Sequence, residues 1–116
     1  MRISFVAVLV ALACVQAHAQ RTATLKGLGN YGCGKYLEHR KTDNEDQDNA
    51  YVSWVWGYLS GYNQFSSHKE VQVPDHPTIL AYLDKYCRDN PLKLVVAGTL
   101  TLIGELDGWK PSARKP

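Results

Sequence analysis

Residues 46–65, DQDNAYVSWVWGYLSGYNQF, form the longest stretch of this chain with helical periodicity. Its apolar and aromatic residues at intervals of three and four are Tyr51, Val55, Tyr58, Tyr62 and Phe65. Residues spaced in this way share one face of an α-helix, and Val52, Trp56 and Leu59 widen that face. The stretch therefore predicts a central helix that begins near Asp46 or Asp48, where carboxylates would cap free amides.

Two glycines, Gly57 and Gly61, lie one turn apart inside this predicted helix. Each costs roughly 1 kcal/mol relative to alanine in a helix interior. Close approach of a second helix would offset that cost. The small residues expected to make this approach are Ala97, Gly98, Thr101 and Gly104.

The first nineteen residues, MRISFVAVLVALACVQAHA, contain basic Arg2, an apolar run over residues 3–13, and Ala17 and Ala19 before Gln20. This pattern is typical of a cleaved export signal. The run is shorter than the ~20 residues of a membrane-spanning helix, so we expect a periplasmic protein without a membrane span. Cys14 offers an alternative, because ALAC loosely resembles a lipoprotein signal whose cysteine is acylated.

Signal cleavage would leave two cysteines, Cys33 and Cys87, in an oxidising compartment. We expect them to form one disulfide, and the long loop that it closes corresponds to roughly 4 kcal/mol of stabilisation. Neither cysteine belongs to a Cys-x-x-Cys motif. A structural role is therefore favoured over thiol catalysis or metal binding.

Removing Arg2 with the signal leaves 12 of the 13 Lys and Arg residues against 11 Asp and Glu residues, a formal net charge of +1. The basic residues form no stripe, which argues against nucleic acid binding. Lys110, Arg114 and Lys115 make residues 107–116 locally positive, and a solvated tail is expected there.

The residues before the central helix predict a lead-in and one short helix. Residues 20–32 are rich in glycine and show no core-forming period, so this segment is expected to be flexible. From Cys33 onward, Tyr36 and Leu37 fall on one side of a helix of about two turns, which ends in the polar run 41–46.

Two further helices are expected after a loop over residues 66–75. The third helix starts at Asp75 or His76, because Pro77 is tolerated in a first helical turn. Its apolar face comprises Ile79, Leu80, Leu83, Tyr86 and Cys87.

The fourth helix is expected to start at Asn90 and Pro91, since Asn is a favoured N-cap and Pro is favoured just after it. Its apolar positions are Leu92, Val95, Val96, Thr99, Leu102, Ile103 and Leu106. The β-branched residues would also suit a strand, but the length of the pattern and the cap favour a helix. The sequence thus predicts one all-α domain over residues 33–106, a small four-helix unit with one disulfide.

No nucleophile with a base, catalytic carboxylate pair or metal cluster stands out. Capping of the central helix explains the acidic residues near its start. His68, Asp75 and His76 form the remaining catalytic or metal-site hypothesis, and we favour exposed loop residues over it. We therefore predict a protein that is not an enzyme and that needs no cofactor and no metal.

The central helix carries more aromatic residues than one core can cover. Positions 54, 55 and 56 cannot all face the same core at about 100° per residue. Either two other helices cover both sides, or some aromatic residues lie at a binding or homodimer surface. On the second interpretation, the candidates for contact with a partner are Trp54, Trp56, Tyr58 and Tyr62.

Several short motifs resemble those of the HdeA/HdeB-like group of small periplasmic proteins. They are Cys-x-x-Tyr-Leu at Cys33, Trp-x-x-Gly-Tyr-x-x-Gly from Trp54 to Gly61, and Tyr-Cys-Arg-Asp-Asn-Pro from Tyr86 to Pro91. The resemblance covers about residues 33 to 106. Small secreted domains of the Rap1a/Tai immunity type share a similar Gly-Tyr-x-x-Gly helix.

The first resemblance implies an all-helical domain with one disulfide and, in its best known members, an ATP-independent chaperone that protects periplasmic proteins in acid. Protonating 11 carboxylates and 3 mature histidines would raise the net charge from +1 toward +15, which favours loosening by self-repulsion. The leading expectation is therefore an acid-stress chaperone that binds unfolded clients. The alternative is an immunity or inhibitor protein that binds one toxin or hydrolase.

Overall fold

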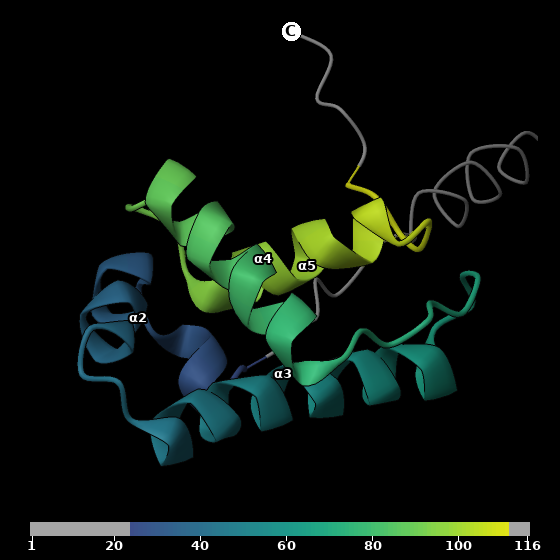
Figure 1. Ribbon diagram of the computed structural model, residues 1–116. Helices are drawn as coiled ribbons and strands as arrows, with labels where there is room; N and C mark the ends of the chain where they lie inside the picture. Colours follow the sequence, from purple (N-terminus) through teal and green to yellow (C-terminus); the bar gives the residue numbers. More distant parts are fainter. Residues whose placement is uncertain (1–23, 112–116) are drawn as a thin grey trace, which may run out of the picture.

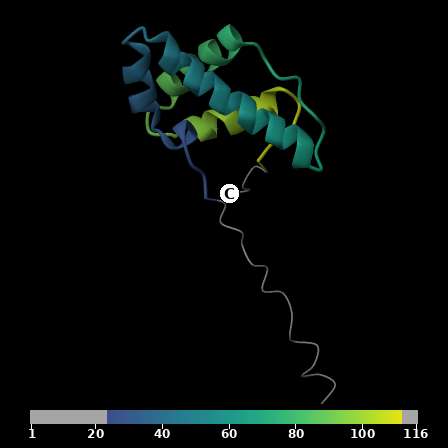
Figure 2. The ribbon, with the colours of Figure 1, turned by 90° about the horizontal axis from the view of Figure 1, so that it is seen from below.

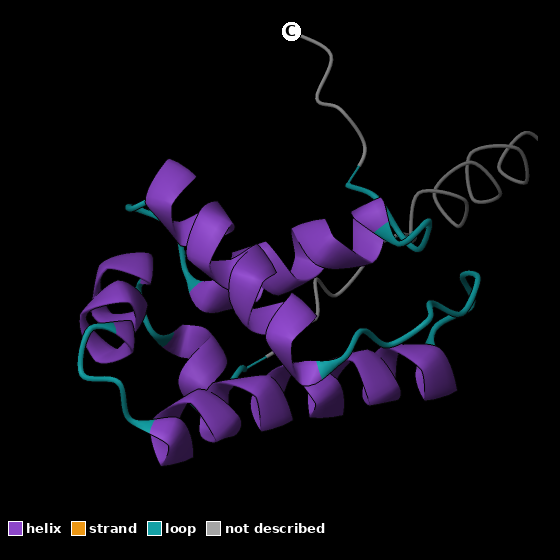
Figure 3. Cartoon of the chain, in the orientation of Figure 1, coloured by secondary structure: helices purple, strands orange, loops and turns teal. Residues whose placement is uncertain are grey.

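The computed structural model describes residues 24–111, so the predicted signal peptide, Cys14 and residues 112–116 lie outside it. The described part contains one short 3-10 helix and four α-helices and no strand (Figure 3). These elements are η1 (Leu28–Asn30), α2 (Cys33–Arg40), α3 (Glu45–Phe65), α4 (His76–Asp89) and α5 (Val95–Glu105). The predicted all-α, four-helix class is confirmed. None of the described helices combines the length and the apolar content needed to cross a membrane.

The four helices form two layers around one core (Figure 1). The long α3 lies along one side of the domain, α4 and α5 cross on the other side, and α2 packs near the start of α3. The view from below shows α3 in front of the other helices (Figure 2). Helix α4 packs against α2, α3 and α5, so it links the other three α-helices.

Helix α3 begins one residue earlier than predicted because Asn44 is its N-cap. The Asn44 Oδ1 atom accepts a hydrogen bond from the Gln47 amide at 3.1 Å. Glu45, Asp46 and Asp48 follow in the first turn, where their charges complement the positive end of the helix dipole. The prediction of a cap at Asp46 or Asp48 is thus wrong, although both contribute to the same helix start.

The core forms mainly where α2, α3, α4 and α5 meet. From α3 it receives Tyr51, Val52, Val55 and Leu59, and from α4 it receives Ile79, Leu80, Leu83 and Cys87. The predicted apolar face of α3 does not stay buried to its end, because Phe65 is 83% exposed. The second half of α3 therefore presents aromatic surface to solvent.

Helix α4 starts as predicted. The Asp75 side chain accepts a hydrogen bond from the Thr78 amide at 3.0 Å, and Pro77 lies in the first turn. The residues before it, 66–75, form the predicted loop. This loop runs back beside α3 and leads directly into α4 (Figure 1).

Helix α5 begins at Val95, so the prediction of a start at Asn90 and Pro91 is wrong. Asn90 instead ends α4, where its side-chain amide donates to the Tyr86 carbonyl at 3.0 Å. Pro91 and Leu92 form a turn, and Leu94 then makes an antiparallel bridge with Gly32. Beside this bridge the Cys33 amide donates to the Lys93 carbonyl at 2.8 Å, and the Val95 amide donates to the Tyr31 carbonyl at 2.9 Å. Pairing with the segment before α2 therefore outweighs the local helix-start signal.

That pairing also moves Leu92 out of the core. Leu92 was expected on the apolar face of the last helix, but it lies in the turn before α5 and is 97% exposed.

Part of the expected lead-in, residues 24–32, packs against α3. Gly29 in η1 is buried, and a Cβ atom at this position would lie only 2.0 Å from the Trp54 ring. Only glycine lets the lead-in lie this close to the indole ring. The lead-in thus forms a cover over the middle of α3.

The described part of the expected tail, residues 107–111, folds back against the end of α5. Asp107 has a φ of 63°, Gly108 donates to the Ile103 carbonyl at 2.9 Å, and Asp107 donates to the Gly104 carbonyl at 3.3 Å. These two bonds form a Schellman cap. The cap turns the chain so that Trp109 is partly buried against the core.

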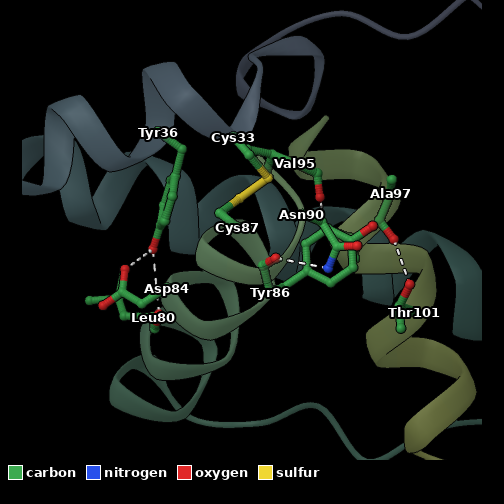
Figure 4. The surroundings of a disulfide bond; sticks show 11 residues. Cys33, Tyr36, Leu80, Asp84, Tyr86, Cys87, Asn90, Val95, Ala97 and Thr101 are labelled. Carbon is green, nitrogen blue, oxygen red and sulfur yellow. Dashed lines mark hydrogen bonds between the residues drawn. A yellow bond between two sulfur atoms is a disulfide. The ribbon is translucent and has the colours of Figure 1, made fainter. Parts of the chain in front are cut away.

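Cys33 and Cys87 form the predicted disulfide, which joins α2 to α4 with a Cα–Cα distance of 4.8 Å. Both residues are fully buried. Figure 4 shows the bond between these two helices, with Tyr36 and Asp84 on one side of it and Asn90 and Thr101 on the other. The bond spans 54 residues of sequence, for which the chain-entropy model gives about 4 kcal/mol of stabilisation.

Candidate functional site

One hollow of the described surface is an apolar groove of about 540 Å³ between α3 and α5. Helix α3 contributes Gly57, Tyr58, Gly61, Tyr62 and Phe65, and the other wall contains Leu100, Ile103 and Trp109. Ser66 and His68 lie at its end. The lining contains no Lys, Arg, Asp or Glu, so the groove suits an uncharged, apolar occupant. We call this hollow, with all of its lining residues, the α3–α5 groove.

The two glycines of α3 explain why this groove is open. An added Cβ atom at Gly57 or at Gly61 would meet no atom within 4 Å. The prediction that the small residues of the last helix pack against these glycines is therefore wrong. Gly98 packs instead against the Tyr86 ring, and Gly104 lies beside Lys110.

Tyr62 holds one end of the groove in place. Its hydroxyl donates to the Lys69 carbonyl at 3.2 Å and accepts a hydrogen bond from the Trp109 amide at 2.8 Å. Gly108 fits tightly against this hydroxyl, since a Cβ atom at position 108 would lie 2.9 Å from it. The loop after α3 and the segment after α5 are thus joined through one phenol group.

The loop over residues 66–75 is fastened to α3 by Asn63. The Asn63 side chain donates to the Val71 carbonyl at 2.9 Å and accepts from the Val71 amide at 2.9 Å. Val71 itself is buried in the core. These contacts hold the loop in place beside the end of α3, next to the groove.

The four predicted contact residues do not form one surface. Tyr58 and Tyr62 line the α3–α5 groove and are half-buried. Burial raises the pKa of Tyr58, so its phenol is neutral under ordinary conditions and leaves the groove uncharged. Trp54 stacks on Tyr58, with ring centroids 5.3 Å apart, and continues this aromatic row beneath the lead-in.

Trp54 is covered by the chain before α2. Its indole Nε1 donates to the Lys26 carbonyl at 3.1 Å, and Gly27 and Gly29 lie against the ring. The interpretation that two other helices cover both sides of this helix therefore applies to Trp54 only in part, because its cover is the lead-in with the short 3-10 helix η1 and not an α-helix.

Trp56 points away from the groove toward the loop before α4. It is 37% exposed, and its Nε1 donates to the Pro74 carbonyl at 2.9 Å. Its ring meets His76 edge-on, with centroids 6.3 Å apart. This tryptophan fastens the loop to α3.

A polar cluster joins α2, α3 and α4 near the disulfide. Arg40 pairs with Asp48 of α3 and with Asp84 of α4, and the Tyr36 hydroxyl donates to Asp84 at 2.8 Å (Figure 4). Burial alone would raise the pKa of Asp84, but the hydrogen bonds from Arg40 and Tyr36 outweigh it and hold this pKa below the ordinary carboxyl value. At neutral pH the Asp84 carboxylate is therefore charged, and it accepts hydrogen bonds from Arg40 and Tyr36.

The residues of the catalytic hypothesis have structural partners. His76 Nε2 lies 2.7 Å from Asn49 Oδ1, Asp75 caps α4, and His68 lies at the end of the groove. Within residues 24–111 no group of three or more His, Cys, Asp or Glu side chains could hold a metal ion.

Comparison with known proteins gives no relative. No protein-family model, curated protein or solved structure matches this chain.

Several groove residues were not singled out from the sequence. Leu100 and Ile103 follow the ordinary apolar period of a helix, and Trp109 was assigned to the tail. The available signal was the pair Gly57 and Gly61, which marks a face without side chains but does not say whether another helix covers it.

Proposed function

We propose that this protein is a non-enzymatic, exported binding protein that holds apolar segments of other proteins in the α3–α5 groove. The observation that carries the proposal is the lining of this groove, which is aromatic, aliphatic and free of Lys, Arg, Asp and Glu. Aromatic side chains around a desolvated hollow are the usual anchors of protein interfaces.

Phe65 supports the use of this surface for binding. A phenylalanine that is 83% exposed leaves a large apolar area in water, and it lies directly at the groove. Each square ångström of such area contributes about 25 cal/mol when a partner covers it. An apolar side chain of a client placed against Phe65 and Tyr62 would remove this area from water.

The leading form of the proposal is an acid-stress chaperone of the HdeA type. Two features support it: the ion pair between Arg40 and Asp84 weakens when the carboxylate is protonated, whereas the disulfide between Cys33 and Cys87 does not respond to acid. Protonation of Asp84 would thus loosen the polar cluster in which Arg40 also holds Asp48 of α3, and would favour exposure of more apolar surface, while the bond keeps α2 and α4 together.

The alternative form is an immunity or inhibitor protein that binds one specific toxin or hydrolase. The observation that favours it is the hollow itself, which is already open in the folded protein because Gly57 and Gly61 are uncovered. A binding site of this kind needs no acid and is ready for one partner of complementary shape.

Aggregation of unrelated client proteins, measured by light scattering at neutral pH and near pH 3, tests both forms. Phe65→Ser removes the exposed groove residue, and Leu92→Ser is the control because Leu92 is also a highly exposed apolar residue, in the distant turn before α5. A chaperone suppresses aggregation of several clients in acid, and only Phe65→Ser weakens this effect.

The alternative predicts a different result. An inhibitor leaves the unrelated clients unprotected at both pH values but copurifies with one partner in a fixed ratio, and Phe65→Ser weakens that complex. If the protein protects no client and keeps no partner, or if Leu92→Ser acts as strongly as Phe65→Ser, the proposed function is wrong.

A further inference from the structure

A second hollow of about 470 Å³ lies between α4 and α5, on a different face of α5 from the α3–α5 groove. Helix α4 contributes Tyr82, Lys85, Tyr86 and Asp89, and α5 contributes Thr101 and Glu105. We call this hollow the α4–α5 cleft. Its size lies within the range of about 300–1,000 Å³ that is common for small-molecule sites.

One wall of the cleft is aromatic. Tyr82 and Tyr86 are one turn apart on α4, so their rings lie on the same face of the helix. The Tyr86 ring lies against Gly98, where an added Cβ atom would be 2.7 Å from the ring carbon Cδ1. Gly98 thus lets the ring lie close to α5, and both tyrosines are half-buried.

The polar groups of the cleft already form hydrogen-bonded pairs. The Tyr82 hydroxyl donates to Glu105 Oε1 at 3.2 Å, and Lys85 Nζ donates to Asp89 Oδ2 at 2.6 Å. The Thr101 hydroxyl donates to the Ala97 carbonyl at 2.9 Å, which leaves its oxygen free to accept (Figure 4). Hydroxyl, ammonium and carboxylate groups therefore lie beside the two rings.

The two tyrosine rings, together with the paired polar groups beside them, disfavour charged ligands and purely apolar ligands. An anion would approach the carboxylates of Asp89 and Glu105, and a cation would compete with Lys85 for Asp89 and with the Tyr82 hydroxyl for Glu105. An apolar ligand would remove water from an ion pair without replacing its hydrogen bonds. A neutral ligand with many hydroxyl groups can exchange hydrogen bonds with each of these side chains.

We infer that the α4–α5 cleft binds a neutral saccharide of one or two rings. The C–H face of the sugar lies on the rings of Tyr82 and Tyr86, and its hydroxyls bond to Glu105, Asp89 and Thr101. This site is separate from the α3–α5 groove, so it adds a carbohydrate-binding property to a protein that binds polypeptides elsewhere.

The test is an NMR titration of the ¹⁵N-labelled chain without residues 1–19, with cellobiose, maltose and N,N′-diacetylchitobiose as probes. At least one disaccharide is expected to shift the amides of Tyr82, Tyr86 and Glu105 with a Kd near the millimolar range, as for a small polar ligand in an open site. The amides of Tyr58 and Gly61 remain unshifted.

Two variants outside the core distinguish this site from adventitious contact. Thr101→Arg fills the cleft from an exposed helix position and is expected to weaken binding by about tenfold or more, and Glu105→Gln by about threefold. Phe65→Ser is the control in the other groove and leaves the Kd unchanged.

Three outcomes would overturn the inference. They are absence of shifts at the cleft amides with all three disaccharides, an equal response to glycerol or choline chloride at the same concentration, and unchanged binding in folded Thr101→Arg. The result is independent of the proposed polypeptide binding, because Phe65→Ser affects only the α3–α5 groove.

Discussion

Arg40 of α2 and Asp84 of α4 form a two-pronged ion pair, with Nε 2.9 Å from Oδ1 and Nη2 3.1 Å from Oδ2. The same two helices are joined by the disulfide between Cys33 and Cys87. Helix α2 is therefore held to α4 by one link that responds to pH and by one that does not. Since Arg40 also pairs with Asp48, the ionic link extends to α3.

The first prediction concerns acid. The folded-state pKa of Asp84 is held below the ordinary carboxyl value, so its contribution to stability is complete above about pH 4 and is lost as the pH falls through the lowered pKa. Asp84→Asn is expected to lower the free energy of unfolding by about 1–3 kcal/mol at neutral pH, because Arg40 and Tyr36 lose a charged acceptor. Urea unfolding at a series of pH values measures this difference.

The difference between wild type and Asp84→Asn should shrink as the pH falls below about 4, where Asp84 becomes protonated in the unfolded chain, and should be lost below the lowered pKa, where it is protonated in the folded chain as well. Glu38→Gln is the matched control, since Glu38 pairs only with Lys35 at an exposed site and should change stability by less than about 0.5 kcal/mol. A pH-independent effect of Asp84→Asn would show that the lost contact is steric and not ionic.

The second prediction concerns the disulfide. Replacing both Cys33 and Cys87 by serine is expected to lower the free energy of unfolding by roughly 4 kcal/mol, because the unfolded chain regains the freedom of a long loop. Thermal unfolding followed by circular dichroism measures the loss. Adding a reductant should reproduce it in wild type and should leave the double variant unchanged; a wild type that is insensitive to the reductant would contradict a stabilising bond.

Local sequence signals predicted α2, the loop over 66–75 and the start of α4. Each of these depends on short-range chemistry, such as the Asp75 cap and the proline that follows it. The start of α5 was mispredicted because the local rule favoured a helix at Asn90, while the Lys93 carbonyl and the Val95 amide bond to the segment before α2. Pairing between residues some sixty positions apart in sequence leaves no local pattern.

The α3–α5 groove could be predicted only in part. Tyr58 and Tyr62 followed from the excess of aromatic residues on α3, since one core cannot cover every direction of a helix. The periodicity could not say which side the other helices cover, and it gave no sign that Gly57 and Gly61 face open space. Trp109 was missed because its burial depends on the Tyr62 hydroxyl, forty-seven residues away.

The third prediction uses these glycines. Gly57→Ala and Gly61→Ala are each expected to raise the free energy of unfolding by roughly 1 kcal/mol, because alanine favours the helix and its Cβ atom meets nothing within 4 Å. Urea unfolding measures the gain. If the groove binds a partner, the double variant should be more stable and yet bind more weakly, since two methyl groups narrow the groove.

Gly98→Ala is the control for this prediction. Gly98 also lies inside a helix, but its Cβ atom would be 2.7 Å from the Tyr86 ring, so the variant should lose stability despite the better helix propensity. A loss of stability in Gly61→Ala would instead mean that another surface already covers the groove in solution.

The fourth prediction concerns the phenol group that joins the two chain segments at the end of the groove. Tyr62→Phe keeps the ring but removes the bonds to the Lys69 carbonyl and the Trp109 amide, and is expected to lower stability by about 1–2 kcal/mol. Hydrogen exchange of the Trp109 amide should become faster, because this group loses its acceptor. Tyr58→Phe is the matched control, since its hydroxyl makes no hydrogen bond to the described part of the chain. Unchanged exchange at Trp109 in Tyr62→Phe would mean that the Schellman cap after α5 positions this tryptophan without help from α3.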